Sequence, residues 1–291
     1  MNERGGSYVV LDGELVAADE ARVPVDDRGF LYGDSVFTTL RCYGGVPFRL
    51  DRHVARLNAS LASPVVSIAH TVDEDDLRRD IARLLERNGC PDAVVRFRVT
   101  RGYGAGPLPP ANATPTTLLT VDPLHLDESL YARGAKLIVS SVRRDPRGEL
   151  GKHKLGSFFW SLMARREAAK QGADEAILCD TDGNWLECAC SNLFAVVEGR
   201  LVTPDTTENI LPGIARETVL ECAEPIGIPV SLRRLTAETA KSAEEWFITN
   251  SVQEIVPVAR IVSTPYTTRG SVTAPLIRAY RDAVARETAG A

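Results

Sequence analysis

The chain has 291 residues, a formal net charge of −5, and 44% hydrophobic against 25% charged residues. This composition is that of a globular protein with a sizeable core, and it excludes an intrinsically disordered chain. The acidic balance argues against a binder of nucleic-acid backbones, so we expect basic pairs such as Arg143 and Arg144 to be solvated surface residues.

The sequence predicts neither membrane nor metal contacts. No run approaches the roughly 20 uninterrupted apolar residues of a membrane helix, and the first ten residues lack the pattern of a signal peptide. The six cysteines are scattered, and no two have the C-x-x-C spacing of a zinc or redox site. We therefore expect free, mostly buried thiols in a cytoplasmic protein.

The first part of the chain alternates strand and helix patterns. The Asp12-Gly13 turn predicts a hairpin, whereas Asp73 as a cap and Gly89 as a terminator bound a strongly patterned helix. The predicted strands cover residues 8–11, 14–17, 35–43, 93–100 and 116–121, and the predicted helices cover 52–62 and 74–88.

The later part contains the same two kinds of pattern, after a connector at 122–135. The predicted strands cover 136–142, 175–180, 192–197, 200–203, 228–232, 245–249 and 255–261, and the helices cover 156–171, 212–223 and 272–288. These patterns predict two α+β domains, residues 1–121 and 136–291.

Lysine residues supply the first candidate for chemistry. Lys154 lies between a predicted strand and an apolar helix, where partial loss of water would favour a neutral amine that can form a Schiff base with an aldehyde. Lys152 is placed equally well by local sequence. A surface lysine is the simpler interpretation of each.

Three further features supply polar groups. In LPGIARETV, the backbone amides of Ile214 and Ala215 begin a helix that can meet an anion. Glu187, in WLECACSN, could pair with a protonated ring nitrogen, and Arg56 could bind a phosphate. A plain helix start, a strand-end carboxylate and a solvated arginine are the ordinary alternatives. Together, however, the features match the parts of a pyridoxal cofactor.

The ordered motifs resemble those of the fold-type IV pyridoxal-phosphate enzymes, the class IV aminotransferases. The resemblance runs from DRGFLYGDSVFTTLR through FRLDRHVARLNAS, HKLGSFFWSLMARREA, GADEAIL, ECACSNLF, LVTP and LPGIAR to FITNSVQEIVPV. It implies a smaller N-terminal α+β domain and a larger C-terminal domain with a β-barrel-like core. It also implies an active site between the domains and a homodimer.

The resemblance assigns the cofactor residues individually. It selects Lys154 over Lys152 for the Schiff base with pyridoxal 5'-phosphate, after which the lysine carries a proton as general acid and base. Glu187 would keep the pyridine nitrogen protonated. The remaining implied cofactor contacts are Arg56, Ser251 and the amides of Ile214 and Ala215 at the phosphate, and Leu211 beneath the ring.

Substrate contacts are implied less directly. The resemblance places Phe37, Thr38, Arg41, Arg96 and Val252 near the substrate, although either arginine could instead form a structural ion pair.

Two departures bear on specificity. Gly106 and Leu108 stand where D-amino-acid aminotransferases of the well-known type have an R-x-H motif. Phe159 stands where branched-chain enzymes have a tyrosine.

Two enzyme functions follow, with a third possibility beside them. The first is an aminotransferase acting between an amino acid, or a primary amine, and a 2-oxo acid. The second is an aminodeoxychorismate lyase, which releases pyruvate and 4-aminobenzoate. The third is a protein that binds the cofactor without catalysis. The sequence leaves the amino donor and its stereochemistry open.

Overall fold

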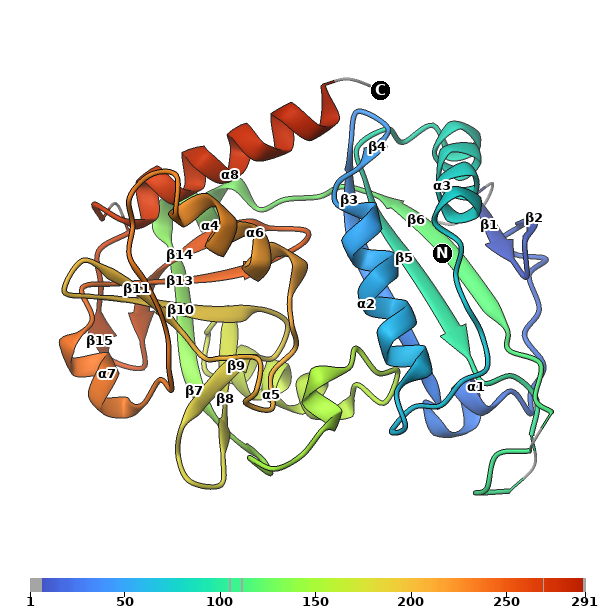
Figure 1. Cartoon of the computed structure of the whole chain (residues 1–291), viewed down its shortest axis with the longest axis horizontal. Helices are drawn as coiled ribbons and strands as arrows, with labels where there is room; N and C mark the ends of the chain where they lie inside the picture. Colours follow the sequence, from blue (N-terminus) through green and yellow to red (C-terminus); the bar gives the residue numbers. More distant parts are fainter. Residues whose placement is uncertain (1–6, 105, 111, 269, 290–291) are drawn as a thin grey trace. The chain divides into compact units, whose positions relative to one another are not determined.

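The computed structural model describes residues 7–104, 106–110, 112–268 and 270–289 (Figure 1). The chain packs as two compact units. Unit 1 comprises Met1–His125, His153–Phe158 and Glu287–Ala291, and unit 2 comprises Leu126–Lys152 and Phe159–Arg286. The short segment that carries Lys154 therefore packs with unit 1. The domain boundaries expected at 122–135 stay a prediction.

Unit 1 is an antiparallel sheet covered by helices. Its described residues form six strands in the order β2-β1-β6-β5-β3-β4, and Figure 1 shows α2 lying along this sheet. In β3, alternate residues including Val36 and Leu40 face the core with α2 and α3, so Phe37 lies on the opposite face. The elements are β1 (Tyr8–Leu11), β2 (Glu14–Ala17), α1 (Arg28–Tyr32), β3 (Ser35–Tyr43), β4 (Val46–Pro47), α2 (Leu50–Ala62), α3 (Glu74–Asn88), β5 (Ala93–Thr100) and β6 (Thr117–Pro123).

Unit 2 contains a mixed sheet. Its described residues form nine strands in the order β12-β11-β10-β13-β14-β7-β8-β9, with β15 paired to β14. Helix α5 packs on β7 and β8. The elements are α4 (Glu128–Arg133), β7 (Ala135–Arg144), η1 (Leu150–Lys152), α5 (Phe159–Lys170), β8 (Glu175–Asp180), β9 (Trp185–Cys188), β10 (Asn192–Val197), β11 (Arg200–Thr203), α6 (Ile214–Ala223), β12 (Val230–Leu232), α7 (Ala237–Ser242), β13 (Glu245–Asn250), β14 (Glu254–Ile261), β15 (Thr264–Pro265) and α8 (Thr273–Thr288). Among the described residues, no helix is both long and apolar enough to cross a membrane.

The structure confirms most predicted strands and helices and corrects some bounds. The helix expected at 156–171 begins at Phe159, because the residues before it run along β3 instead. The helix expected at 212–223 begins at Ile214, after extended backbone at Gly213. The sequence patterns do not predict α1, because its five residues are too few to show a helical period.

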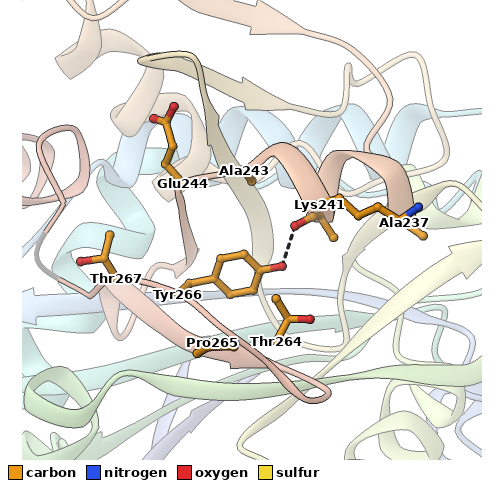
Figure 2. A pocket seen from close by; sticks show the side chains of 9 residues that line it. Ala237, Lys241, Ala243, Glu244, Thr264, Pro265, Tyr266 and Thr267 are labelled. Atoms are coloured by element: carbon orange, nitrogen blue, oxygen red, sulfur yellow. Dashed lines mark hydrogen bonds between the residues drawn. The ribbon is translucent and has the colours of Figure 1, made fainter.

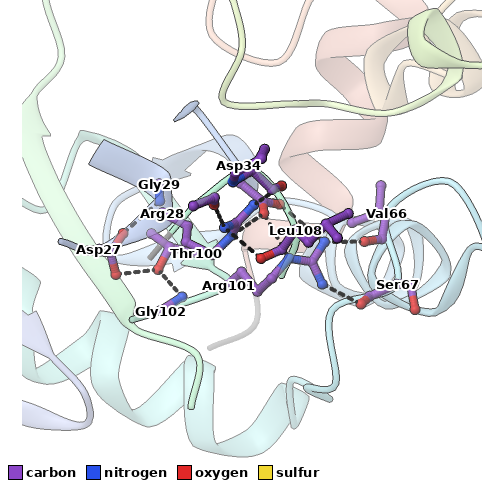
Figure 3. A network of polar contacts seen from close by, with 12 residues as sticks. Asp27, Arg28, Gly29, Asp34, Val66, Ser67, Thr100, Arg101, Gly102 and Leu108 are labelled. Atoms are coloured by element: carbon purple, nitrogen blue, oxygen red, sulfur yellow. Dashed lines mark hydrogen bonds and ion pairs between the residues drawn. The ribbon is translucent and has the colours of Figure 1, made fainter. Parts of the chain in front are cut away.

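A network of polar contacts ties α1 to two loops of unit 1 (Figure 3). Asp34 accepts hydrogen bonds from Arg28 Nε at 2.9 Å and from Arg101 Nε and Nη2 at 2.7 and 3.1 Å. Arg28 also donates to the carbonyls of residues 106–107, and Arg101 donates to those of residues 66–67. The carboxylate of Asp34 thus neutralises two guanidinium groups that also donate hydrogen bonds to backbone carbonyls.

Candidate active site

Lys154 is held beside the first residues of β3. Phe37 N donates to the Lys154 carbonyl at 2.9 Å, and Gly156 N donates to the Ser35 carbonyl at 2.7 Å. These two bonds extend the edge of the sheet by a short segment that includes Lys154. The lysine Nζ lies 4.6 Å from the centroid of the Phe37 ring. The backbone of unit 1 therefore sets the position of this amine.

One face of α2 contributes His53 and Arg56, which are three residues apart and so lie on the same side of the helix. A hydrogen bond of 2.7 Å joins His53 Nδ1 to Thr38 Oγ1, and Arg56 Nη2 donates to the same hydroxyl at 3.3 Å. Burial lowers the pKa of His53 well below its ordinary value, and the positive charges of Arg56 and Lys154 lower it further. His53 is therefore a neutral residue within a cluster of cations.

Two of the arginines expected near the substrate have other contacts. Arg41 is half-buried, and its guanidinium stands over the ring of Tyr43 at 4.2 Å. Arg96 is exposed and forms an ion pair with Asp122 on β6. Phe37 thus contacts Lys154, whereas Thr38, the next residue of β3, contacts His53 and Arg56 of α2. The structure places Arg41 and Arg96 further along β3 and β5, and their substrate roles stay predictions.

Unit 2 holds the carboxylate of Glu187 in a specific set of hydrogen bonds. Glu187 is buried on β9, and Arg144 Nη1 donates to its Oε1 at 2.5 Å. Asn192 Nδ2 and the backbone N–H of Leu211 donate to Oε2, each at 3.2 Å. The expectation that Arg144 is a solvated surface residue was wrong: its side chain is 18% exposed and is paired with Glu187. Sequence reasoning missed this arginine because its partner is distant in the chain.

Helix α6 begins beside these residues without a side-chain cap from its N-cap residue. Gly213 precedes the helix in an extended conformation and has no side chain to cap it, and the N–H groups of Ile214 and Ala215 belong to the first turn, where no intrahelical acceptor exists. A Cβ on Gly213 would overlap Asn192 Oδ1, which requires glycine at this position. Such a helix start favours a phosphate through both its N–H groups and its dipole.

The remaining predicted residues lie after β13. Ser251 and Val252 are half-buried in a turn, where Asn250 Oδ1 accepts a hydrogen bond from Val252 N at 3.0 Å. A hollow of unit 2 lies elsewhere. It measures about 700 Å³ and is lined by α7 and residues 264–267 (Figure 2). Tyr266 Oη donates across it to the Ala240 carbonyl at 2.8 Å, and none of the predicted site residues lines it.

Comparison with known proteins gives the family. The model of the family described as amino-transferase class IV matches residues 35–261, and the chain belongs to this family. Its larger sheet is the curled half-barrel of fold-type IV enzymes.

Particular relatives differ in reaction. The chain is 36% identical over 254 residues to a putative branched-chain-amino-acid aminotransferase of Methanocaldococcus jannaschii, with 87% of each chain covered. It is 30% identical over 277 residues to the aminodeoxychorismate lyase of Bacillus subtilis, covering 94% of this chain and 93% of the lyase. It superposes with a TM-score of 0.87 and 28% identity on a T.th. branched-chain amino acid aminotransferase complexed with N-(5'-phosphopyridoxyl)-L-glutamate, covering 98% of this chain and 95% of that one.

The donor set fits pyridoxal phosphate, on which this family depends. An aldehyde requires a primary amine, a protonated pyridine nitrogen requires a carboxylate, and a phosphate requires N–H donors or a guanidinium. Lys154, Glu187 and the start of α6 supply these three groups. The buried Glu187 carboxylate, held by Arg144, is the most specific of them because a buried carboxylate needs a compensating partner.

Proposed function

We propose that the chain is a pyridoxal-phosphate-dependent aminotransferase that moves an amino group between an amino acid and a 2-oxo acid, with Lys154 as the residue that binds the cofactor covalently. The observation that carries the proposal is the position of Lys154, whose amine lies over the Phe37 ring and acts electrostatically on His53 together with Arg56. Family membership supports it.

Each residue then has one task. Bound pyridoxal phosphate supplies an electron-withdrawing ring that stabilises negative charge at the substrate α-carbon. With the cofactor bound, Lys154 Nζ would act as the general base and acid that carries the proton of the substrate α-carbon. The Glu187 carboxylate, which Arg144 holds in place, would accept a hydrogen bond from a protonated ring nitrogen. Arg56, Ser251 and the backbone amides of Ile214 and Ala215 would hold the phosphate of the cofactor, and Leu211 would pack against its ring.

Mapping of the covalent attachment tests the proposal without measuring turnover. The full-length protein is loaded with pyridoxal phosphate, reduced with borohydride and digested, and the modified lysine is identified by mass spectrometry. Lys154 is the expected site, and Lys154→Ala should carry no adduct. Lys152→Ala is the matched control, because Lys152 lies two residues away and pairs with Glu149 at 3.0 Å. An adduct on any other lysine, or none in the wild type, would contradict the proposal.

The lyase reaction is the second candidate. The similarity to the Bacillus subtilis lyase over almost the whole chain favours it. So does Phe159, which stands where the resemblance places the tyrosine of the branched-chain enzymes and which has no hydroxyl group. Aminodeoxychorismate incubated with the loaded protein in the absence of any 2-oxo acid distinguishes the two reactions. Release of pyruvate would establish the lyase. A strict need for a 2-oxo acid would establish the aminotransferase.

We also propose that the protein is a homodimer. Helix α5 exposes the apolar side chains of Phe159, Trp160, Leu162 and Met163, each at least 42% accessible to solvent. Neighbouring exposed apolar side chains of this size are typical of interfaces. Light scattering of the purified chain tests the proposal, since a monomer would contradict it. Cytoplasmic location stays a prediction from the sequence.

A further inference from the structure

Arg98 lies next to the Lys154 segment, although sequence reasoning did not select it. It stands opposite Phe37 in the register of β5 and β3, with its guanidinium carbon 5.0 Å from the centroid of the Phe37 ring. Because Lys154 Nζ is 4.6 Å from the same centroid, one aromatic ring contacts both cations. Arg98 Nη1 donates to Ser35 Oγ at 2.8 Å.

The backbone around Lys154 is shaped to admit this guanidinium. A Cβ on Gly156 would lie 2.6 Å from Arg98 Nη1 and would overlap Ser35 Oγ. The guanidinium therefore fills the space that a side chain would occupy two residues after Lys154. An anion bound to Arg98 would lie beside the segment that carries the amine.

Among the described residues of unit 1, Arg98 differs from its neighbouring arginines because no carboxylate pairs with it. Arg28 and Arg101 each pair with Asp34, and Arg96 pairs with Asp122. No carboxylate among the described residues lies within ion-pair distance of Arg98, whose hydrogen-bond partner is the neutral Ser35 hydroxyl. Partial burial lowers the pKa of Arg98, yet a guanidinium keeps its proton at neutral pH. A half-buried cation with unused N–H donors is suited to an anionic ligand.

We propose that Arg98 binds the carboxylate of the substrate and so selects amino acids and 2-oxo acids over amines that lack a carboxylate. The inference rests on the proposed function, because it takes Lys154 as the reactive amine. A guanidinium pairs with a carboxylate through two parallel hydrogen bonds, which fixes the orientation of the ligand as well as its charge. Arg98 is therefore a specificity-determining residue, in the role that the resemblance assigns to Arg96.

Ligand binding to the loaded, full-length protein tests this role without turnover. Butyrate and its neutral isostere butyramide are titrated while the cofactor absorbance is followed. Arg98→Gln should weaken butyrate binding at least about tenfold, since a lost hydrogen bond to a charged group has that effect. Butyramide binding should not change, and Arg98→Lys should retain part of the butyrate affinity because it keeps the charge.

Arg87→Gln is the matched control. Arg87 also stands over an aromatic ring, at 4.3 Å from the centroid of Tyr8, and donates to the hydroxyl of that tyrosine at 2.8 Å, but it lies on α3. Its replacement should leave butyrate binding unchanged. The proposal is overturned if Arg98→Gln leaves butyrate binding intact, if it weakens butyramide equally, or if the loss follows Arg96→Gln instead.

The borohydride adduct separates this inference from the proposed function. If wild-type protein carries no adduct on Lys154, the proposed function fails. If the adduct forms in wild type and in Arg98→Gln while butyrate affinity is unaltered, only the role of Arg98 fails. Adduct formation in the variant also shows that it folds.

Discussion

Replacement of Asp34 by asparagine should destabilise the protein more than replacement of any exposed carboxylate on α3. Asp34 accepts three hydrogen bonds from Arg28 and Arg101, and the side chains of these arginines are 5% and 14% exposed. Removing one partner of a buried ion pair costs about 3–5 kcal/mol. Asparagine keeps one acceptor, and Asp34 is 20% exposed, so we expect the low end, about 3 kcal/mol.

Urea unfolding at neutral pH measures this loss. Asp80→Asn is the control, because Asp80 pairs on α3 at 2.8 Å with Arg83, whose side chain is 50% exposed, and this pair should contribute under about 0.5 kcal/mol. If Asp34→Asn lowers the free energy of unfolding by no more than Asp80→Asn does, the interpretation of the network is wrong.

The difference in the free energy of unfolding between wild type and Asp34→Asn should depend on pH. Burial acts to raise the pKa of Asp34, but hydrogen bonds and charges from Arg101 and Arg28 outweigh it, so the pKa lies below its ordinary value. The stabilisation is therefore complete above the unfolded pKa, about 4, and is lost as the pH falls through the lower folded value. The gap between wild type and Asp34→Asn should close in acid. A gap that stays constant down to about pH 2 would refute the charge argument.

Three further variants test other contacts. Arg144→Met should weaken retention of pyridoxal phosphate at least about tenfold, as measured by release on dialysis, because Glu187 loses the cation that orients it; unchanged retention would mean that Glu187 acts alone. Gly156→Ala should reduce the thermal midpoint, since its Cβ would overlap Ser35 Oγ, and an unchanged midpoint would show that the segment can move aside. Burial raises the pKa of Glu175, and Arg165 offsets this only in part, so ionisation of Glu175 lowers the free energy of unfolding as the pH rises from the ordinary pKa of the group toward the raised one. Glu175→Gln should therefore gain stability relative to wild type in urea unfolding as the pH rises above about 4, the ordinary pKa of a glutamate, and a difference independent of pH would disprove this assignment.

Elements with local signals could be predicted from the sequence. Helix α3 has the predicted bounds, because Asp73 accepts a hydrogen bond from Asp76 N at 3.0 Å and Gly89 takes a left-handed conformation with φ of 63°. Both interactions lie within a few residues of the helix end, so the amino-acid order alone specifies them. The start of α5 could not be predicted in this way, because the residues before Phe159 form hydrogen bonds with β3, which is distant in the chain.

The amino-acid order by itself determined the family, the α+β composition and the choice of Lys154, Glu187 and Arg56 as candidates, because these depend on motifs of neighbouring residues. Only the tertiary structure decided which cations are neutralised. Arg144 meets Glu187 43 residues away in the chain, and Arg96 meets Asp122 26 residues away, whereas Arg98 meets the ring of Phe37 and a hydroxyl. These three arginines thus have different environments. The register and the order of the strands, and not the local sequence, determine the distances between their charges and other groups.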